Sequence, residues 1–228
     1  MRACPSPNFG PRRGGGAPHL IVLHFTAMAS AAEALERLCD PVAEVSAHYL
    51  IDLDGTLWSL VPEEARAWHA GAGAWGGCAD VNSASVGIEL QNRGDHPYPQ
   101  PQMGALCALL DAIRARHAIP PQGVIGHADL APTRKADPGP RFDWRGLARA
   151  GHAVWPAPAA ADGPPLAVSL ARFGYPAAPM PALLAAFRAR FRPWARGPED
   201  ATDRALAANL SARFPPAQSA AKPPVAGS

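Results

Sequence analysis

The sequence lacks three features that would have assigned it to a class at once. It has no run of about 18 apolar residues, so no segment is expected to span a bilayer. Its formal net charge is only +2, which is too small to indicate a nucleic-acid partner. Residues 1–16 are rich in Arg, Pro and Gly and lack the apolar core of a secretory signal. The chain as written is therefore expected to be cytoplasmic, whereas a mis-set start would hide a leader and favour the periplasm or envelope.

Cysteine and charge are also scarce, whereas apolar residues and proline are abundant. The four cysteines show no CxxC pairing, the spacing of many zinc and redox motifs. Hydrophobic residues make up 48% of the 228 residues and charged residues 18%, which is enough for a packed medium domain and a small one. The 27 prolines are numerous enough to mark linkers. The oligomeric state cannot be derived from these numbers, and we expect a monomer.

Apolar periodicity predicts strands and helices that alternate along the first two thirds of the chain. Ser30 followed by Glu33 forms a capping box that predicts a short helix. Asp54-Gly55 supplies the turn of a hairpin across 45–61. The remaining expected elements are strands at 19–24, 86–92 and 124–127, an amphipathic helix at 102–117 and a short helix near 142–150. Interleaved strands and helices with one hairpin predict an α/β fold, a mixed central sheet flanked by helices.

Composition divides the chain into five parts. We expect an irregular N-terminal lead-in over 1–17, a catalytic domain over 18–155, a Pro/Ala-rich linker over 156–165, a small three-helix domain over 166–214 and a disordered tail over 215–228. Within the three-helix domain, Arg188, Arg190 and Arg192 are expected to form a solvated helix face.

The stretch 126–140 carries the most chemistry. It follows a short apolar strand end, and Pro132, Pro138 and Pro140 argue against helix and central strand alike, so we predict a loop. A loop that brings His, Lys and Asp to the end of a buried strand is typical of a site on a rigid frame. Asp129, in the same stretch, is expected to cap a turn.

Two residues of this stretch, His127 and Asp137, are candidate zinc ligands, and His24 is the best candidate for the third. His24 ends a buried apolar strand, which is a usual place for a site in α/β folds. A catalytic zinc needs three protein ligands and one open position, and it lowers the pKa of its water to about 7. Cleavage of an amide also needs a base and a cation near the developing oxyanion, and Glu89 and Lys135 can supply them. Spacing alone leaves His24 open as an ordinary core histidine.

Five segments together resemble a known family. They are 21–28, 45–51, 68–71, 82–90 and 126–140, in that order. The chain resembles the zinc-dependent N-acetylmuramoyl-L-alanine amidases of the type-2 group, whose fold is shared with peptidoglycan recognition proteins and some phage lysozymes. Residues 170–176 and 186–193 similarly resemble that family's three-helix peptidoglycan-binding module.

The resemblance implies a function and a site. It implies a Zn²⁺ hydrolase that cleaves the amide between N-acetylmuramic acid and L-alanine in bacterial peptidoglycan or muropeptides. It assigns the metal to His24, His127 and Asp137, the acid or base to Glu89, and the oxyanion-side cation to Lys135. The alternative is a module of the same fold that recognises peptidoglycan without cutting it. Such members lose zinc ligands, whereas this chain retains all three candidates.

Four further residues of the matched segments are candidate substrate contacts: Trp68, His69, His48 and Asn82. For two of them another role is open. His48 could instead orient a metal ligand from behind. Trp68 could simply pack in a half-buried loop.

Overall fold

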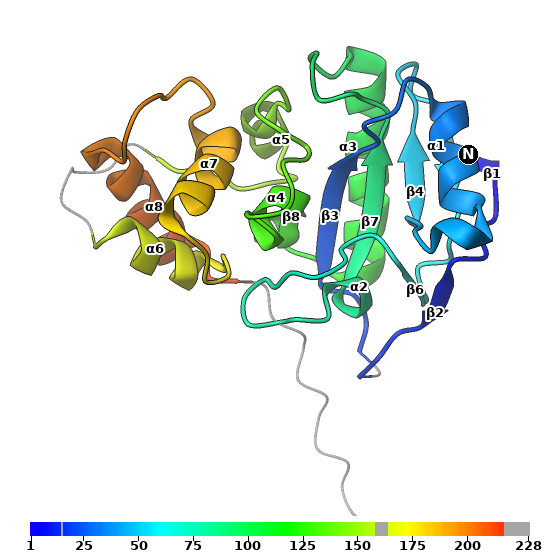
Figure 1. The fold of residues 1–228 in the computed structure, drawn as a ribbon, viewed down its shortest axis with the longest axis horizontal. Helices are drawn as coiled ribbons and strands as arrows, with labels where there is room; N and C mark the ends of the chain where they lie inside the picture. The colour runs from blue at the N-terminus through cyan, green and yellow to red at the C-terminus, as the bar shows by residue number, and fades with distance from the viewer. Residues whose placement is uncertain (15, 158–163, 217–228) are drawn as a thin grey trace, which may run out of the picture.

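A six-stranded sheet forms the centre of the computed structural model, which describes residues 1–14, 16–157 and 164–216 (Figure 1). The strand order is β1-β5-β4-β7-β3-β8, and all neighbours are parallel except β4 and β5. The strands are β1 (Arg2–Ala3), β3 (Leu20–Phe25), β4 (Tyr49–Ile51), β5 (Leu57–Ser59), β7 (Ser85–Leu90) and β8 (Val124–Gly126). A second, two-stranded sheet pairs β2 (Phe9–Pro11) with β6 (Ala65–Ala67). The predicted α/β class with a mixed sheet is confirmed.

The helices cover both faces of the large sheet (Figure 1). They are α1 (Ala31–Cys39), α2 (Val81–Ala84), α3 (Gln100–His117), α4 (His127–Leu130), α5 (Trp144–Arg149), α6 (Leu166–Phe173), α7 (Met180–Phe191) and α8 (Ala201–Arg213), with short 3₁₀ turns at Pro41–Ala43 and Pro121–Gly123. Among the described residues, no helix has the length and apolarity needed to cross a membrane.

Local signals in the sequence set several of these boundaries. The Ser30 hydroxyl accepts a hydrogen bond from the Glu33 backbone N–H at 3.2 Å and so caps the start of α1. Gly55 has φ of +85°, a conformation that a residue with a side chain rarely adopts, at the predicted turn between β4 and β5. The hairpin predicted over 45–61 is therefore present, with its two strands shorter than the prediction.

Alternation along β3 and β7 separates a core face from a site face. The apolar residues that pack with α3 in one cluster include Ile21, Leu23, Val86 and Ile88. Because side chains of a strand alternate between faces, His24 and Glu89 lie on the opposite face. These two residues are also register partners on neighbouring strands, so they sit side by side at the carboxyl ends.

The three C-terminal helices do not stand apart from the sheet. One continuous apolar cluster joins Leu20, Val22 and Ile125 of the sheet to residues of α6, α7 and α8, among them Leu170 and Phe187. Helix α7 contacts both α4 and α5 (Figure 1). The helical unit therefore completes the core beside β8, the edge strand of the sheet.

Two expectations about irregular regions were wrong. Residues 1–17 contain strands β1 and β2, because β5 and β6, distant in sequence, supply their backbone partners. The stretch 126–140 begins with one helical turn, α4, which ends before Pro132. The expected turn cap is present there, since the Asp129 carboxylate accepts a hydrogen bond from the Gly126 N–H at 2.8 Å. Most of the predicted linker, 158–163, and of the predicted disordered tail, 217–228, lies outside the described residues.

Candidate metal centre and catalytic cavity

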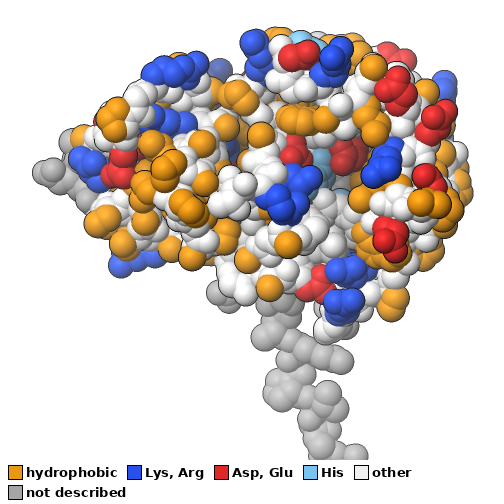
Figure 2. Space-filling view, viewed as in Figure 1, with side chains coloured by type: hydrophobic (Ala, Val, Ile, Leu, Met, Phe, Trp, Pro, Cys, Tyr) orange, Lys and Arg blue, Asp and Glu red, His pale blue; other side chains and the backbone are white. Residues whose placement is uncertain are grey.

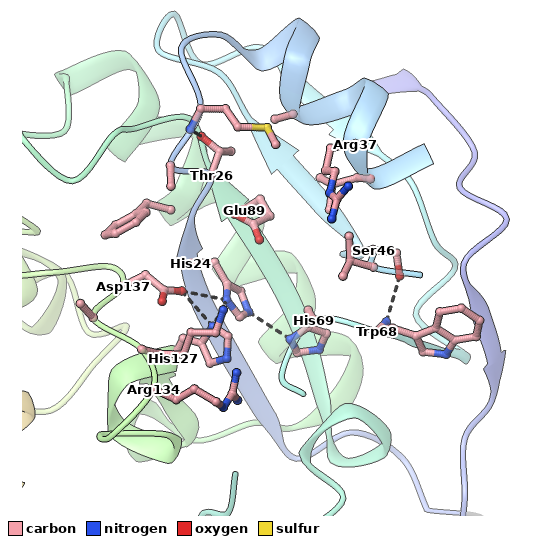
Figure 3. A pocket seen from close by; sticks show the side chains of 18 residues that line it. His24, Thr26, Arg37, Ser46, Trp68, His69, Glu89, His127, Arg134 and Asp137 are labelled. Carbon is pink, nitrogen blue, oxygen red and sulfur yellow. Dashed lines mark hydrogen bonds and ion pairs between the residues drawn. The ribbon is translucent and has the colours of Figure 1, made fainter. Parts of the chain in front are cut away.

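Three side chains from separate segments converge at the carboxyl end of the sheet. His24 is the next-to-last residue of β3, His127 begins α4 directly after β8, and Asp137 lies in the following loop. The two Nδ1 atoms are 2.9 Å apart, and each lies 3.0 Å from Asp137 Oδ2 (Figure 3). All three residues are buried. Because β3 and β8 are parallel neighbours, the ends of both strands bring their histidines to one edge.

Hydrogen bonds on the far side of each ring fix which nitrogen faces the cluster. His127 Nε2 lies 3.0 Å from the Ala70 carbonyl oxygen, which can only accept, so Nε2 carries the proton. In the neutral imidazole, Nδ1 then presents a lone pair toward His24 and Asp137. Burial lowers the pKa of His24 to about 4, so His24 is neutral at pH 7.

His24 is oriented by a second histidine in a similar way. Its Nε2 lies 3.0 Å from His69 Nδ1, and His69 Nε2 lies 3.2 Å from the Ser85 hydroxyl. That hydroxyl also donates to the Val81 carbonyl at 2.6 Å. A consistent assignment has Ser85 donating to Val81, His69 Nε2–H donating to Ser85, and His24 Nε2–H donating to His69. The His24 Nδ1 lone pair then also faces the cluster.

Three electron-pair donors that face one another at 2.9–3.0 Å repel unless a cation lies among them. Two imidazoles and one carboxylate suit zinc and match the ligand count of a catalytic site. Tetrahedral zinc, with ligand distances of about 2.0–2.1 Å, separates its ligand atoms by about 3.3 Å. The cluster needs to open by only about 0.3 to 0.4 Å to meet that spacing, so these residues fit the metal.

Asn82 fixes the backbone of residues 69 and 70, which orients both histidine ligands: His69 contacts His24, and the Ala70 carbonyl contacts His127. The Asn82 side-chain oxygen accepts hydrogen bonds from the N–H groups of His69 and Ala70 at 3.0 and 2.8 Å. Asn82 is buried and is not among the residues that line the cavity. The backbone of residues 69 and 70 thus occupies the side-chain oxygen of Asn82, and contact of Asn82 with substrate stays a prediction.

His48 also lies behind the site. It is fully buried, does not line the cavity, and accepts a hydrogen bond from the Gly87 N–H at 2.9 Å. Its ring makes an edge contact with the His69 ring, with centroids 5.7 Å apart. Of the two roles considered for His48, its position matches support of the frame and not contact with substrate.

A cavity of about 390 Å³ opens over the cluster, and Figure 2 shows it as a hollow with histidine and acidic side chains at its base. Trp68 and His69 line it, and their contact with substrate stays a prediction. Its lining includes three basic residues, Arg37, Arg134 and Lys135, and Figure 3 shows Arg37 and Arg134 on opposite sides of the cavity. Sequence reasoning missed both arginines as cavity residues, although Arg134 precedes a residue that was singled out.

Glu89 lies in this cavity beside His24, and its Oε2 has no hydrogen-bond partner among the described residues. Burial raises the pKa of Glu89 to about 8; the negative charge of Asp137 adds to the increase and Lys135 opposes it. A carboxyl whose pKa lies near neutrality can both accept and donate a proton at pH 7. A divalent cation in the adjacent cluster would lower this pKa.

Comparison with known proteins gives one consistent result. The family described as N-acetylmuramoyl-L-alanine amidase matches residues 14–140. N-acetylmuramoyl-L-alanine amidase AmiD of Escherichia coli K12 is 36% identical over 231 aligned residues, which cover 86% of this chain and 83% of AmiD.

The similar solved structures include two complexes with muropeptides. One is E. coli AmiD in complex with the substrate anhydro-N-acetylmuramic acid-L-Ala-D-γ-Glu-L-Lys, with a TM-score of 0.77, 33% identity, and coverage of 90% of this chain and 98% of that one. The other is AmpDh3 from Pseudomonas aeruginosa in complex with anhydromuramic pentapeptide, with a TM-score of 0.79, 31% identity, and coverage of 89% and 95%.

Proposed function

The chain belongs to the N-acetylmuramoyl-L-alanine amidase family. We propose that it cleaves the amide bond of its substrate with the help of one zinc ion, held by His24, His127 and Asp137. As a member of this family it is a hydrolase of peptidoglycan turnover. The bond is the amide between the lactyl group of N-acetylmuramic acid and the L-alanine of the stem peptide. The observation that carries the metal assignment is the set of three mutually facing lone pairs at 2.9–3.0 Å.

Two side chains of the protein carry out proton transfer and charge stabilisation beside the proposed zinc. When bound, zinc supplies a Lewis acid and lowers the pKa of a water to about 7. Glu89 accepts the proton of the attacking water and returns it to the leaving amine nitrogen, a double role that suits a carboxyl whose pKa burial raises to about 8. Lys135, at the rim of the same cavity, stabilises the negative charge that develops on the amide oxygen.

The basic rim supports a stem peptide as the part of the substrate that is recognised. A stem peptide that contains γ-linked glutamate exposes a free α-carboxylate, and Arg37, Arg134 and Lys135 provide positive charge for it. The AmiD and AmpDh3 structures described above were both solved with anhydro-muropeptides. We therefore infer that anhydro-muropeptides are among the substrates of this chain.

The alternative function is recognition of muropeptide without cleavage. In this chain the three donors converge, and a carboxyl with a raised pKa lies beside them in the cavity. A binding module has no need of that fourth group, so hydrolysis is the better account.

The test is digestion of purified anhydro-N-acetylmuramic acid-L-Ala-D-γ-Glu-L-Lys in water enriched in ¹⁸O, followed by mass spectrometry. We expect free tripeptide and anhydro-N-acetylmuramic acid with one ¹⁸O in its lactyl carboxylate. A strong chelator should abolish this product, and added Zn²⁺ should restore it. Binding of the muropeptide without any release of tripeptide would instead establish the recognition module.

A further inference from the structure

Arg190 of α7 is buried and points into the catalytic half of the molecule. Its side chain is 2% exposed, in contrast to the solvated helix face that its composition suggested. The guanidinium stacks on the Trp144 ring at 4.3 Å, and its Nη2 donates to the Val124 carbonyl at 3.0 Å. An arginine of the C-terminal helical unit therefore contacts β8, the strand that leads directly to His127.

The same guanidinium forms an ion pair with a buried acid on the other side of that metal ligand. Arg190 Nη1 lies 2.6 Å from Asp129 Oδ2, and the Asp129 side chain is also 2% exposed. The other carboxylate oxygen accepts a hydrogen bond from the Tyr175 hydroxyl. Two residues of the helical unit thus engage one carboxylate of α4.

That carboxylate controls a very short helix. Helix α4 has four residues, His127 is the first, and the Asp129 carboxylate caps it through the Gly126 N–H at 2.8 Å. Four residues form barely one helical turn, so α4 cannot be stable by itself. Its geometry, and with it the direction of the His127 ring, depends on what holds Asp129.

We propose that Arg190, with Tyr175, is a positioning residue for the metal ligand His127, acting through Asp129 and Val124. The C-terminal helical unit is then a structural part of the metal centre. Loss of Arg190 leaves the buried Asp129 carboxylate without its cation, and such a charge either draws in water or moves toward solvent. Either response tilts α4 and moves Nδ1 of His127 away from His24 and Asp137. The proposal rests on the proposed metal site and names a further determinant of its affinity.

The same helix offers a matched control. Arg188 of α7 is also buried and also forms an ion pair, with Asp203 of α8 at 2.5 Å. Its other bonds go to the carbonyl oxygens of Gly197 and Pro198, inside the helical unit. Arg188→Gln therefore breaks a comparable buried pair without a contact to α4, and it reports the effect of weakening the helical unit alone.

The experiment measures the Zn²⁺ affinity of the full-length metal-free protein by competition with a chromophoric chelator, and the visible spectrum of the Co²⁺-loaded protein. Loss of groups that orient metal ligands typically weakens affinity by about 10- to 100-fold. We expect a loss in that range for Arg190→Gln, together with a changed Co²⁺ spectrum. Tyr175→Phe should show a smaller loss, and Arg188→Gln should stay within about threefold of the wild type.

A double variant separates positioning from general damage. If Arg190 acts through Asp129, then Asp129→Asn combined with Arg190→Gln should bind Zn²⁺ no more weakly than the worse single variant. Equal affinity losses for Arg190→Gln and Arg188→Gln would overturn the proposal, as would a folded Arg190→Gln protein with wild-type affinity and spectrum. A wild-type protein that binds no Zn²⁺ would instead refute the metal site itself, and this inference with it.

Discussion

Substitution of Gly87 by alanine tests whether His69, which contacts the proposed metal ligand His24, contributes to zinc affinity and stability. Gly87 lies in the middle of β7, directly under the His69 ring. A Cβ at this position would lie 2.4 Å from His69 Cγ and 2.7 Å from its Nδ1, whereas ordinary contacts begin at 3.4 Å. The strand cannot yield, because Gly87 is paired in the parallel ladder with Val22 and bonded to His48 through both its N–H and its carbonyl.

The His69 ring must therefore retreat by about 1 Å, the difference between 2.4 and 3.4 Å. Overpacking of this kind costs about 1–3 kcal/mol of unfolding free energy. For a chain of this size, each kcal/mol shifts the melting temperature by about 2–4 °C, so we expect a decrease of about 2 to 12 °C. The displacement also breaks the 3.0 Å contact with His24 Nε2, and we expect Zn²⁺ affinity to fall about 10- to 100-fold.

The assays are thermal unfolding of the metal-free protein and chelator competition for Zn²⁺. Gly104→Ala is the control, because Gly104 lies in helix α3 and a Cβ there meets nothing within 4 Å. That substitution should raise stability by about 0.5–1 kcal/mol and leave Zn²⁺ affinity unchanged. A Gly87→Ala protein that melts at the wild-type temperature and binds zinc equally well would refute the role assigned to His69.

Three further outcomes follow from the cavity. Glu89→Gln should lower kcat by about 10²- to 10⁴-fold while zinc content stays at the wild-type level; near-normal turnover would remove Glu89 from the proton transfers. Because the folded-state pKa of Glu89 is raised to about 8, the metal-free folded chain holds this proton more tightly than the unfolded chain, so its contribution to stability is present below about pH 4.5 and is lost as pH rises toward 8. Urea unfolding at several pH values should show a shallower decline for Glu89→Gln, and parallel curves would contradict the raised pKa. Lys135→Met should lower kcat by about 10²- to 10³-fold with an unchanged melting temperature, because Lys135 is exposed at the rim; an effect confined to KM would assign it to substrate binding instead.

The convergence of His24, His127 and Asp137 follows from general rules of sheet geometry. Each histidine ends or directly follows a predicted buried strand, and parallel neighbours bring such ends to one edge. The pairing of residues 24 and 89 on one face depends on the register of β3 and β7, because the run before His24 is apolar throughout and shows no alternation. The resemblance to a known family then selected these residues over other histidines.

The groups that orient the proposed metal ligands could not be predicted in this way. The carbonyl that fixes His127 belongs to Ala70, and every residue has a carbonyl, so no side-chain pattern marks it. Asn82 was a candidate substrate contact because it lies in a segment that resembles the family, yet its amide oxygen accepts hydrogen bonds from the backbone N–H groups of residues 69 and 70. Such roles depend on how loops close in space.

The burial of Arg190 could have been predicted from helical geometry. Phe187, Arg190 and Phe191 are spaced at three and four residues and therefore share one face of α7. The two aromatic residues make that face apolar, which places Arg190 inside with them. Treating Arg188, Arg190 and Arg192 as a solvated set by residue type alone missed this spacing.

The most direct test of the metal centre is a count of zinc per chain by elemental mass spectrometry after dialysis. The wild type should retain one zinc, as should His152→Ala, which removes a buried histidine outside the cavity. His127→Ala and Asp137→Ala, if folded by circular dichroism, should retain none. A wild type without zinc, or ligand variants that keep a full equivalent, would contradict the metal centre described above.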